Sequence, residues 1–472
     1  MKVILVWPTG RPEVKVLLDE IEKAGHEIVY WVGEHPAAHL SPKGAIFHDH
    51  YDAWDAKPAE AYKKESFPPP NAELIESMYE TESLILTMMN KHYDAAPVDE
   101  RKHIYYTMLG YWTTVLDRLK PEVVVFNDIP HSLYSNVLGD LARKRGIRSV
   151  MFEGTLVAGR VVRYADVWKG SEELAAAVSE NAKRHLTSDA LGPELRAYWE
   201  EVLSRGNAPI WYIKEQDLQT RGAGLTRIRI NAALRALRSG TFTHLAWDFV
   251  RRKFTNDLKS EYREVEHQTD LSRPFVFFAM NFQPERSSSP QGGIFHDQIL
   301  AAETLAAALP EGWELYIKEH PSQWLLRGKT RYTSARYKGY YRRLAAIPRV
   351  RIIPIEMTPR QFVESSQAVA TITGSIAVEA VLWGKRALIF GAVWYRDCPG
   401  VVRVQSVEDC RRVFAEIREG KRVRKEDALA FLKAIEDVGV RTNVGDEVPR
   451  MSEEDSMRAF ALSVRDALGK AK

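Results

Sequence analysis

The chain has 472 residues, of which 45% are hydrophobic and 27% are charged, and its formal net charge is +3. This composition is typical of a folded globular protein, and the length exceeds what one hydrophobic core usually serves, so we expect two domains. So small a net charge argues against a nucleic-acid-binding protein. Cys398 and Cys410 are the two cysteines, which argues against a disulfide framework or a cysteine zinc site and fits a reducing compartment.

The amino-terminal apolar run, Lys2 to Trp7, is too short for a signal peptide and lacks a small-residue cleavage site. No apolar segment approaches the length of a membrane span. We therefore expect a cytoplasmic protein.

The first part of the chain alternates β-branched or aromatic runs with helical stretches, which is the pattern of a parallel sheet with crossover helices. The expected strands cover residues 2–7, 27–32, 122–126 and 149–152. We assign residues 1–170 to a Rossmann-like, acceptor-binding domain with a less regular insertion at 36–115. Residues 171–270 show only helical periodicity and form an expected helical connector.

The α/β pattern returns after the connector. The expected strands cover residues 274–279, 314–317, 350–354, 368–372 and 386–390. We assign residues 271–424 to a second Rossmann-like domain that binds the donor, and residues 425–472 to C-terminal helices. The predicted fold class is therefore α/β, with two Rossmann-like domains facing a cleft.

The connector contains a strongly basic segment. Between Thr220 and Phe254, eight basic residues and one acidic residue, Asp248, give a local charge of +7, and apolar residues recur among them at mostly helical spacing. A basic amphipathic helix of this kind can rest on an anionic membrane surface. The alternative is a solvated helix face with its apolar side in the core. Both interpretations stay open.

Two groups of residues predict a phosphate site in the second domain. Lys318 and His320 follow one expected strand, while Gly374 and Ser375 follow another and precede a helix. Carboxyl ends of parallel strands are where open α/β sheets bind ligands. We expect Ser375 to cap the helix whose first N–H groups face the anion, and Glu379, one turn on, to accept hydrogen bonds from ribose hydroxyls. A structural histidine and a plain Gly-Ser helix start are the alternatives.

A polar loop follows the expected strand 274–279. Gln283, Glu285 and Arg286 bring an amide, a carboxylate and a guanidinium close together. Such a set can hold a sugar, or place Glu285 as a nucleophile or base. Because Ser, Pro and Gly follow, a surface loop is the alternative. Later in the chain, Arg396 can grip a sugar carboxylate or pair structurally with Asp397 or Glu379.

Acidic residues end two strands of the first domain. Glu153 follows the expected strand 149–152, and Asp128 with His131 follows strand 122–126. If the domains face each other, these residues line the opposite wall of the cleft. A carboxylate there suits a general base for an acceptor hydroxyl, although acidic residues also end strands for capping reasons.

These residues together resemble the capsule polysaccharide biosynthesis family, which includes β-Kdo transferases and lies near the bacterial sialyltransferases. The resemblance covers roughly residues 273–404 and extends to the first domain through Glu153-Gly154. The motifs are Gln283-Pro284-Glu285, His320-Pro321, Thr373-Gly374-Ser375 with Glu379-Ala380, Gly384-Lys385, Phe390-Gly391 and Pro399-Gly400.

The resemblance implies a GT-B glycosyltransferase that uses a CMP-activated acidic sugar such as Kdo or a sialic-acid relative, and a glycan or glycolipid acceptor. It implies that His320 and Ser375 hold the CMP phosphate, that Glu379 binds the ribose, and that Glu153 is the base. It nominates Glu285 as the nucleophile of a retaining reaction.

A CMP leaving group carries one phosphate, which a histidine and a helix amino terminus can stabilise, so we expect neither a metal nor a cofactor. Two alternatives stay open: a GT-B enzyme with a UDP-sugar or CDP-glycerol donor, and a non-catalytic scaffold of a glycan assembly complex.

Overall fold

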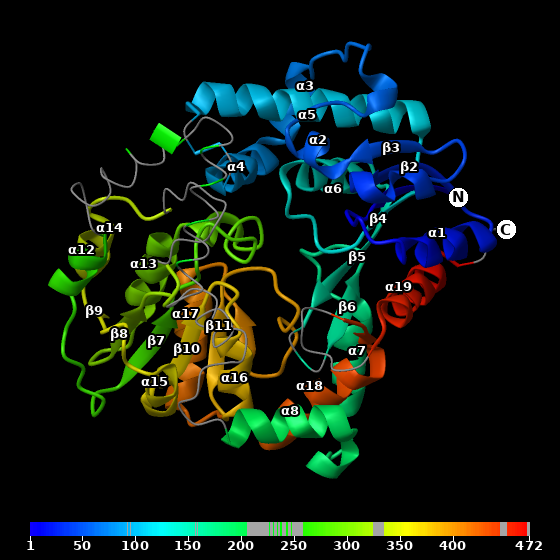
Figure 1. Cartoon of the computed structure of the whole chain (residues 1–472). Helices are drawn as coiled ribbons and strands as arrows, with labels where there is room; N and C mark the ends of the chain where they lie inside the picture. Colours follow the sequence, from blue (N-terminus) through cyan, green and yellow to red (C-terminus); the bar gives the residue numbers. More distant parts are fainter. Residues whose placement is uncertain are drawn as a thin grey trace.

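Two β-sheets with helices on both faces form two α/β domains in a computed structural model of the chain (Figure 1). The structure describes residues 1–204, 258–323, 335–443 and 451–469, apart from residues 92, 95, 156 and 158, together with isolated positions between 226 and 247. Most of the basic segment 220–254 therefore lies outside the described residues. The expected α/β fold with two Rossmann-like domains is confirmed.

The first sheet has seven strands in the order β13-β6-β5-β4-β1-β2-β3. The run from β5 to β3 is parallel, whereas β6 and β13 are antiparallel to their neighbours. The strands are β1 (Lys2–Val6), β2 (Glu27–Gly33), β3 (Ile46–Asp49), β4 (Val123–Phe126), β5 (Arg148–Gly154), β6 (Arg160–Tyr164) and β13 (Val440–Arg441). Strands β3, β6 and β13 were not expected, since all are short and two of them carry arginines.

The second sheet has six parallel strands in the order β12-β11-β10-β7-β8-β9. The strands are β7 (Phe275–Ala279), β8 (Glu314–Lys318), β9 (Val350–Ile352), β10 (Ala368–Thr371), β11 (Arg386–Ile389) and β12 (Val401–Arg403). Because β7 lies between β8 and β10, the loops that follow these three strands leave the same edge of the sheet side by side.

Helices cover both faces of the first sheet. Apolar residues of β1 point alternately to the two sides, with Val3 and Leu5 packing under α1 and α19, and Ile4 and Val6 packing with the α4, α5 and α6 layer. The helices of this domain are α1 (Val14–Lys23), α2 (His50–Trp54), α3 (Ala72–Ser77), α4 (Tyr79–Met88), α5 (Val98–Leu119) and α6 (Leu133–Lys144). The short 3₁₀ helices are η1 (His35–Leu40), η2 (Glu60–Tyr62) and η3 (Met89–Lys91).

The second sheet is sandwiched in the same way. Val276 and Phe278 of β7 pack toward α13, α14 and α17, whereas Phe275 and Phe277 pack toward α15 and α16. The helices are α13 (Gln298–Ala308), α14 (Tyr340–Ala345), α15 (Pro359–Ser365), α16 (Ile376–Leu382) and α17 (Val407–Arg418), with η5 (Gly293–His296). The connector contributes α7 (Glu172–Asn181), η4 (Ser188–Ala190), α8 (Pro193–Ser204) and α12 (Leu258–Glu264).

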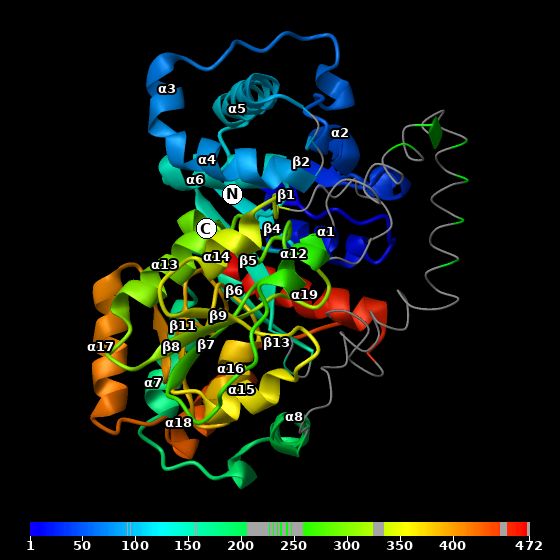
Figure 2. The same ribbon diagram turned by 90° about the vertical axis from the view of Figure 1, so that its left-hand side faces the viewer.

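The C-terminal segment returns to the first domain. Helix α18 (Lys425–Val438) packs against α7, β13 joins the first sheet, and α19 (Glu453–Leu468) lies beside α1, where the red and blue helices meet in Figure 1. The two views place α5 at one end of the molecule and α18 at the other (Figure 1, Figure 2). The last helices therefore complete the first domain rather than extending the second.

Candidate active site

A cavity of about 380 Å³ opens between the two domains. Its walls come from the end of β5 in the first domain and from the loops after β7, β8 and β10 in the second. The predicted site residues that line it are Glu153, Glu285, Arg286, Lys318, His320, Gly374 and Ser375. His320 and Ser375, on different loops, thus share one cavity.

His320 is held with a defined ring tautomer. Its Nδ1 atom accepts a hydrogen bond from the backbone N–H of Ser322 at 3.2 Å. A ring nitrogen that accepts cannot also carry a proton, so the neutral ring carries its proton on Nε2. In the neutral ring, Nε2 is therefore the hydrogen-bond donor.

Lys318 is the last residue of β8 and is buried. Burial lowers the pKa of its ammonium group to about 8, against the opposing influence of Glu356 and Glu319. Burial removes water from the ammonium group and makes its charge costly. An anion bound in the cavity would offset this desolvation cost. The position suits a phosphate-binding residue.

Ser375 does not cap α16 as expected. Its backbone is already helical, with φ −58° and ψ −21°, and its side chain makes no capping hydrogen bond. A capping serine needs extended backbone angles so that its oxygen turns back to the first N–H groups. The turn is held instead by Thr371, whose Oγ1 accepts from the Gly374 N–H at 3.2 Å.

Asn281 organises the floor of the cavity, a role that the sequence pattern did not indicate. Its side chain donates to the Thr373 hydroxyl at 3.1 Å, and its Oδ1 accepts from the Thr371 hydroxyl at 2.9 Å. It thereby joins the loop after β7 to the loop after β10. Its place directly beyond a buried strand was the available signal.

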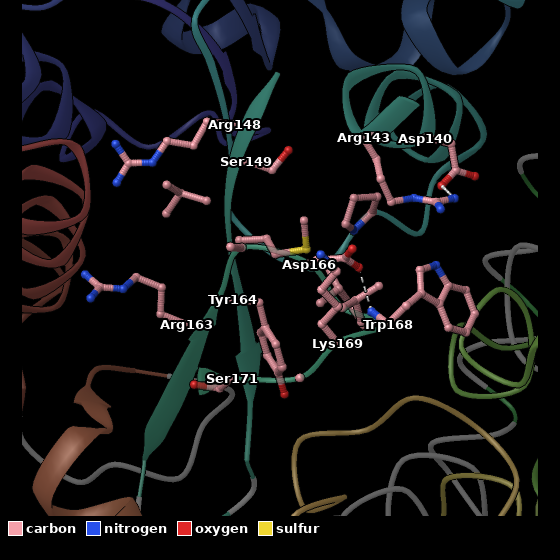
Figure 3. Close-up of a pocket in the computed structure, with 18 of the residues that line it drawn as sticks. Asp140, Arg143, Arg148, Ser149, Arg163, Tyr164, Asp166, Trp168, Lys169 and Ser171 are labelled. Carbon is pink, nitrogen blue, oxygen red and sulfur yellow. Dashed lines mark hydrogen bonds and ion pairs between the residues drawn. The ribbon is translucent and has the colours of Figure 1, made fainter. Parts of the chain in front are cut away.

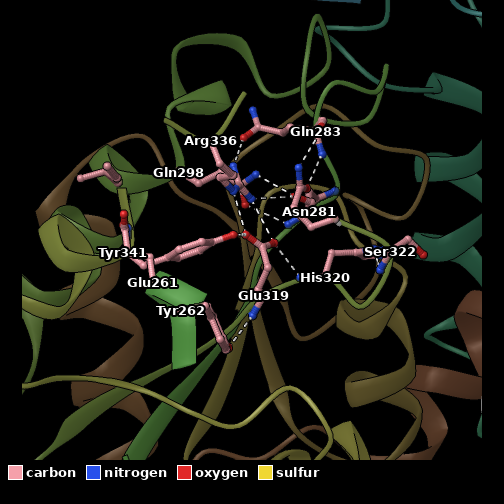
Figure 4. Close-up of polar contacts among 12 residues, drawn as sticks. Glu261, Tyr262, Asn281, Gln283, Gln298, Glu319, His320, Ser322, Arg336 and Tyr341 are labelled. Carbon is pink, nitrogen blue, oxygen red and sulfur yellow. Dashed lines mark hydrogen bonds and ion pairs between the residues drawn. The ribbon is translucent and has the colours of Figure 1, made fainter. Parts of the chain in front are cut away.

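A buried charged network holds the loops after β7 and β8 together (Figure 4). Arg336 donates to the carboxylate of Glu319 through Nε at 2.7 Å and Nη2 at 3.1 Å, and it also contacts the Gln283 side chain. Tyr341 donates to the same carboxylate at 2.7 Å. Because Glu319 directly precedes His320, the network fixes the approach of the histidine loop to the cavity.

Three predicted site residues, Gln283, Glu379 and Arg396, lie outside the cavity lining. The amide of Gln283 donates to the His296 carbonyl at 2.7 Å and accepts from Arg336, so it serves the fold of its loop. Glu379 is a buried residue of α16. It follows Ser375 by about one helical turn and is not among the residues that line the cavity.

Arg396 also lies elsewhere, at the contact between the domains. Its Nη1 donates to the backbone carbonyl of Trp168 at 2.6 Å. This contact is neither of the two that we expected, which were binding of a sugar carboxylate and an ion pair with Asp397 or Glu379. The guanidinium instead ties the loop after β11 to a turn of the first domain.

Glu153 forms the opposite wall of the cavity and sits inside β5, one residue before its end. Its carboxylate accepts from the Tyr164 hydroxyl and from the Gln291 amide, both at 2.8 Å. Burial raises the pKa of Glu153 to about 7, while Arg286 and the two hydrogen bonds act against this rise. A carboxyl that titrates near neutrality suits a general base.

The loop after β7 reaches across to the first domain. Arg286 forms an ion pair with Asp128, and the neighbouring Glu285 is exposed at the cavity, where Ser287 donates to its carboxylate at 3.1 Å. Asp128 and His131 were expected to line the wall of the cleft; Asp128 instead pairs with Arg286, and neither residue lines the cavity. His131 lies near the same contact, lining a smaller adjoining hollow with Glu285 and Arg286.

A larger cavity of about 510 Å³ lies beside the first (Figure 3). It is bounded by α6, β5, β6 and the turn that carries Trp168, and it contains equal numbers of acidic and basic side chains. Tyr164 and Gln291 line it and separate it from Glu153. Because the predicted phosphate-binding residues are absent from its lining, the smaller cavity is the better candidate for the active site.

Within the residues that the structure describes, no three His, Cys, Asp or Glu side chains gather as metal ligands would. In the same part of the chain, no helix combines the length and apolar character of a membrane span.

Residues 291–429 match the sequence profile of a family described as capsule polysaccharide biosynthesis protein. No curated protein sequence matches the chain. The match covers less than half of the chain and confirms the resemblance for the second domain, from Gln291 into α18.

Several solved structures are similar to the chain at low identity. A β-Kdo 2,7 transferase, KpsC of Thermosulfurimonas dismutans, is 11% identical over 75% of this chain and 88% of that chain, with a TM-score of 0.32. Its β-Kdo 2,4 transferase counterpart is 13% identical over 66% and 79%, with a TM-score of 0.29. The UDP-GlcNAc 2-epimerase of Neisseria meningitidis is 13% identical over 99% of both chains, with a TM-score of 0.24.

Proposed function

We propose, on the premise that residues 291–429 carry the sequence of the capsule polysaccharide biosynthesis family, that the chain is a GT-B glycosyltransferase of surface polysaccharide synthesis. It transfers an acidic sugar, Kdo or a sialic-acid relative, from a CMP-activated donor to a glycan or glycolipid acceptor. The observation that carries the proposal is the shared cavity, in which Lys318, His320 and Ser375 face Glu153 across the two domains.

In the proposed reaction, the second domain receives the CMP phosphate. The Nε2 proton of His320 and the ammonium of Lys318 donate hydrogen bonds to the phosphate as the glycosidic C–O bond breaks and the oxygen leaves with the bonding electrons. Glu285 attacks the anomeric carbon in the same step and forms a glycosyl ester. CMP departs with its phosphate stabilised by these two donors.

The first domain then receives the acceptor. Glu153 takes the proton of an acceptor hydroxyl, and the oxygen attacks the anomeric carbon, which releases the Glu285 carboxylate. Two displacements retain the configuration of the sugar. If Glu285 is not the nucleophile, the same base drives one direct displacement and inverts it.

We further propose that the reaction needs no divalent metal. The single phosphate of a CMP leaving group carries less negative charge than a diphosphate, so Lys318 and His320 can stabilise it without a metal ion. Turnover that survives EDTA at the rate measured in Mg²⁺ supports this. Loss of activity in EDTA, restored by Mg²⁺, would replace it with a metal-assisted mechanism.

The donor class is tested by thermal-shift measurements with CMP, UDP, CDP and GDP side by side. A ligand that binds only the folded protein raises the melting temperature. Stabilisation by CMP alone supports the proposal. Stabilisation by UDP or CDP, followed by turnover of a UDP-sugar or CDP-glycerol, would contradict the CMP-sugar donor and identify the other compound as the donor. No response to any nucleotide favours the scaffold.

We also propose peripheral attachment to the inner face of the membrane. Ile230, Leu234 and Leu237 are helical positions with side chains 54%, 48% and 57% exposed. Their spacing places them on one helix face, within the segment whose sequence carries a local charge of +7. Salt-sensitive sedimentation with anionic but not zwitterionic vesicles, lost in Leu234→Glu, supports attachment. Equal sedimentation with anionic and zwitterionic vesicles, or no sedimentation with either type, contradicts membrane attachment.

A further inference from the structure

Gln291 occupies a fixed place in the loop after β7, at the point where the second domain meets the first. It is a buried residue. Its backbone carbonyl accepts from the Ala392 N–H at 2.8 Å, and its own N–H donates to the Arg286 carbonyl at 3.1 Å. The residue is therefore anchored to the second domain, on the chain that follows β11.

The side chain of Gln291 crosses to the first domain. Its Nε2 donates to the Ala392 carbonyl at 2.9 Å and to Oε1 of Glu153 at 2.8 Å. The backbone carbonyl can only accept, and the ionised carboxylate can only accept, so the amide must present its NH₂ group to both. The two hydrogens of one amide thus join the Glu153 carboxylate to the second domain.

Three further residues among those that the structure describes act on the Glu153 carboxylate. Tyr164, on β6, donates to the second carboxylate oxygen at 2.8 Å. Arg286 is the neighbouring positive charge, and Asp128, on the loop after β4, is the neighbouring negative charge. Among these, Gln291 and Arg286 belong to the second domain, while Tyr164 and Asp128 belong to the first.

We propose that Gln291 is a positioning residue through which the donor domain orients and ionises Glu153, so that the base is complete only when the two domains meet. This inference rests on the proposed role of Glu153 as base. It explains why an amide from a distant loop is committed to a carboxylate that already has a tyrosine partner. Acceptor activation is then confined to the arrangement in which Gln291 of the second domain reaches Glu153 of the first.

The pH dependence of turnover tests the proposal. Both hydrogen bonds to the carboxylate favour its ionised form, and burial favours the neutral form. Gln291→Met keeps the volume of the side chain but removes the donor, so the midpoint of the acidic limb of kcat should move to higher pH. A movement of one unit, from about 7 to about 8, lowers kcat at pH 7 about fivefold and at pH 9 by only about a tenth. The donor KM should change little.

A matched control removes a different contact between the domains. Ser289 and Thr87 share a hydrogen bond of 2.7 Å that does not involve Glu153. Ser289→Ala should leave the acidic limb at its wild-type position. A limb that moves equally in both variants means that general loosening of the domain contact is responsible, and it overturns the specific role of Gln291.

A second measurement does not need turnover. The infrared carboxyl band that disappears in Glu153→Gln reports the protonation of Glu153 directly, and its titration midpoint should lie higher in Gln291→Met than in the wild type. An unmoved midpoint overturns the inference whether or not the protein transfers a sugar. A moved midpoint in a protein that turns over no nucleotide-sugar supports the positioning and refutes the proposed function instead.

Discussion

The guanidinium of Arg336 lies against the carboxylate of Glu319 with an Nε–Oε2 distance of 2.7 Å, and both side chains are wholly buried. Arg336 also donates to the Asn281 carbonyl at 3.2 Å. One side chain therefore links the start of the loop after β7 to the residue that precedes His320. The position of His320 at the cavity therefore depends on a buried ion pair.

We expect Arg336→Met to leave the Glu319 carboxylate buried without its ion-pair partner and to lower the free energy of unfolding by about 3–5 kcal/mol. Arg336→Met combined with Glu319→Leu should recover part of this loss, because the isolated charge is gone. Urea unfolding of the two variants measures both values. Equal losses in the single and double variants would mean that packing, and not charge, is responsible.

His320→Ala should lower kcat by roughly 10²–10³-fold, since the variant removes one of the two donors that we propose for the departing phosphate. His320→Gln keeps an N–H near the position of Nε2 and should retain part of the rate. The free energy of unfolding should change by only about 1 kcal/mol, the value of the lost hydrogen bond from Ser322. Steady-state kinetics and urea unfolding measure the two effects. A wild-type rate in the alanine variant contradicts the role of the ring.

The central strands of both sheets were predictable because their apolar runs are unbroken and bounded by glycine or proline. The predicted strands also placed the loops that carry Lys318, His320 and Ser375 close together, since neighbouring parallel strands end at one edge of a sheet. Strand β13 was not predictable, because two residues carry no periodicity.

The site residues that sequence reasoning missed act through tertiary contacts. Arg336 is 17 positions from Glu319 in the chain, and Gln291 is 138 positions from Glu153. No local pattern relates such pairs. Ser375 illustrates the opposite error, because a serine before a helix has the same sequence whether it is the cap or already inside the first turn.

Lys318→Met should stabilise the protein and weaken donor binding. The folded pKa of about 8 lies below the ordinary value of 10.5, so below pH 8 the ammonium is buried at a cost that the methionine variant lacks. The gain should be on the order of 1–3 kcal/mol at pH 7 and shrink as pH rises from 8 toward 10.5, where the wild type regains stability. Denaturant unfolding against pH measures the gain, and CMP titration measures the weaker binding. Unaltered CMP affinity would remove Lys318 from the phosphate site.

For Glu153 we expect the opposite change, a loss of stability as the pH rises. Its folded pKa of about 7 lies above the ordinary value of 4.5, so between these values the folded state holds a proton that the unfolded state has lost. Stability should therefore fall as pH rises from 4.5 to 7, by at most about 3 kcal/mol, and then level off. Glu153→Gln should flatten this slope while abolishing transfer to the acceptor. Urea unfolding at a series of pH values checks the slope, and an equal slope in the variant contradicts the assignment.

The nucleophile can be tested without any knowledge of the acceptor. Glu285 is exposed at the cavity with Ser287 donating to its carboxylate at 3.1 Å, so it is accessible to an anomeric carbon held by the phosphate site. Incubation of the wild type with a CMP-sugar should produce a protein heavier by one glycosyl residue, and peptide mapping should place that residue on Glu285. Glu285→Gln should form no adduct and lose transfer, yet bind CMP with wild-type affinity, because the substitution leaves Lys318 and His320 in place. Transfer by Glu285→Gln at the wild-type rate would exclude this carboxylate as the nucleophile and favour a single inverting displacement driven by Glu153.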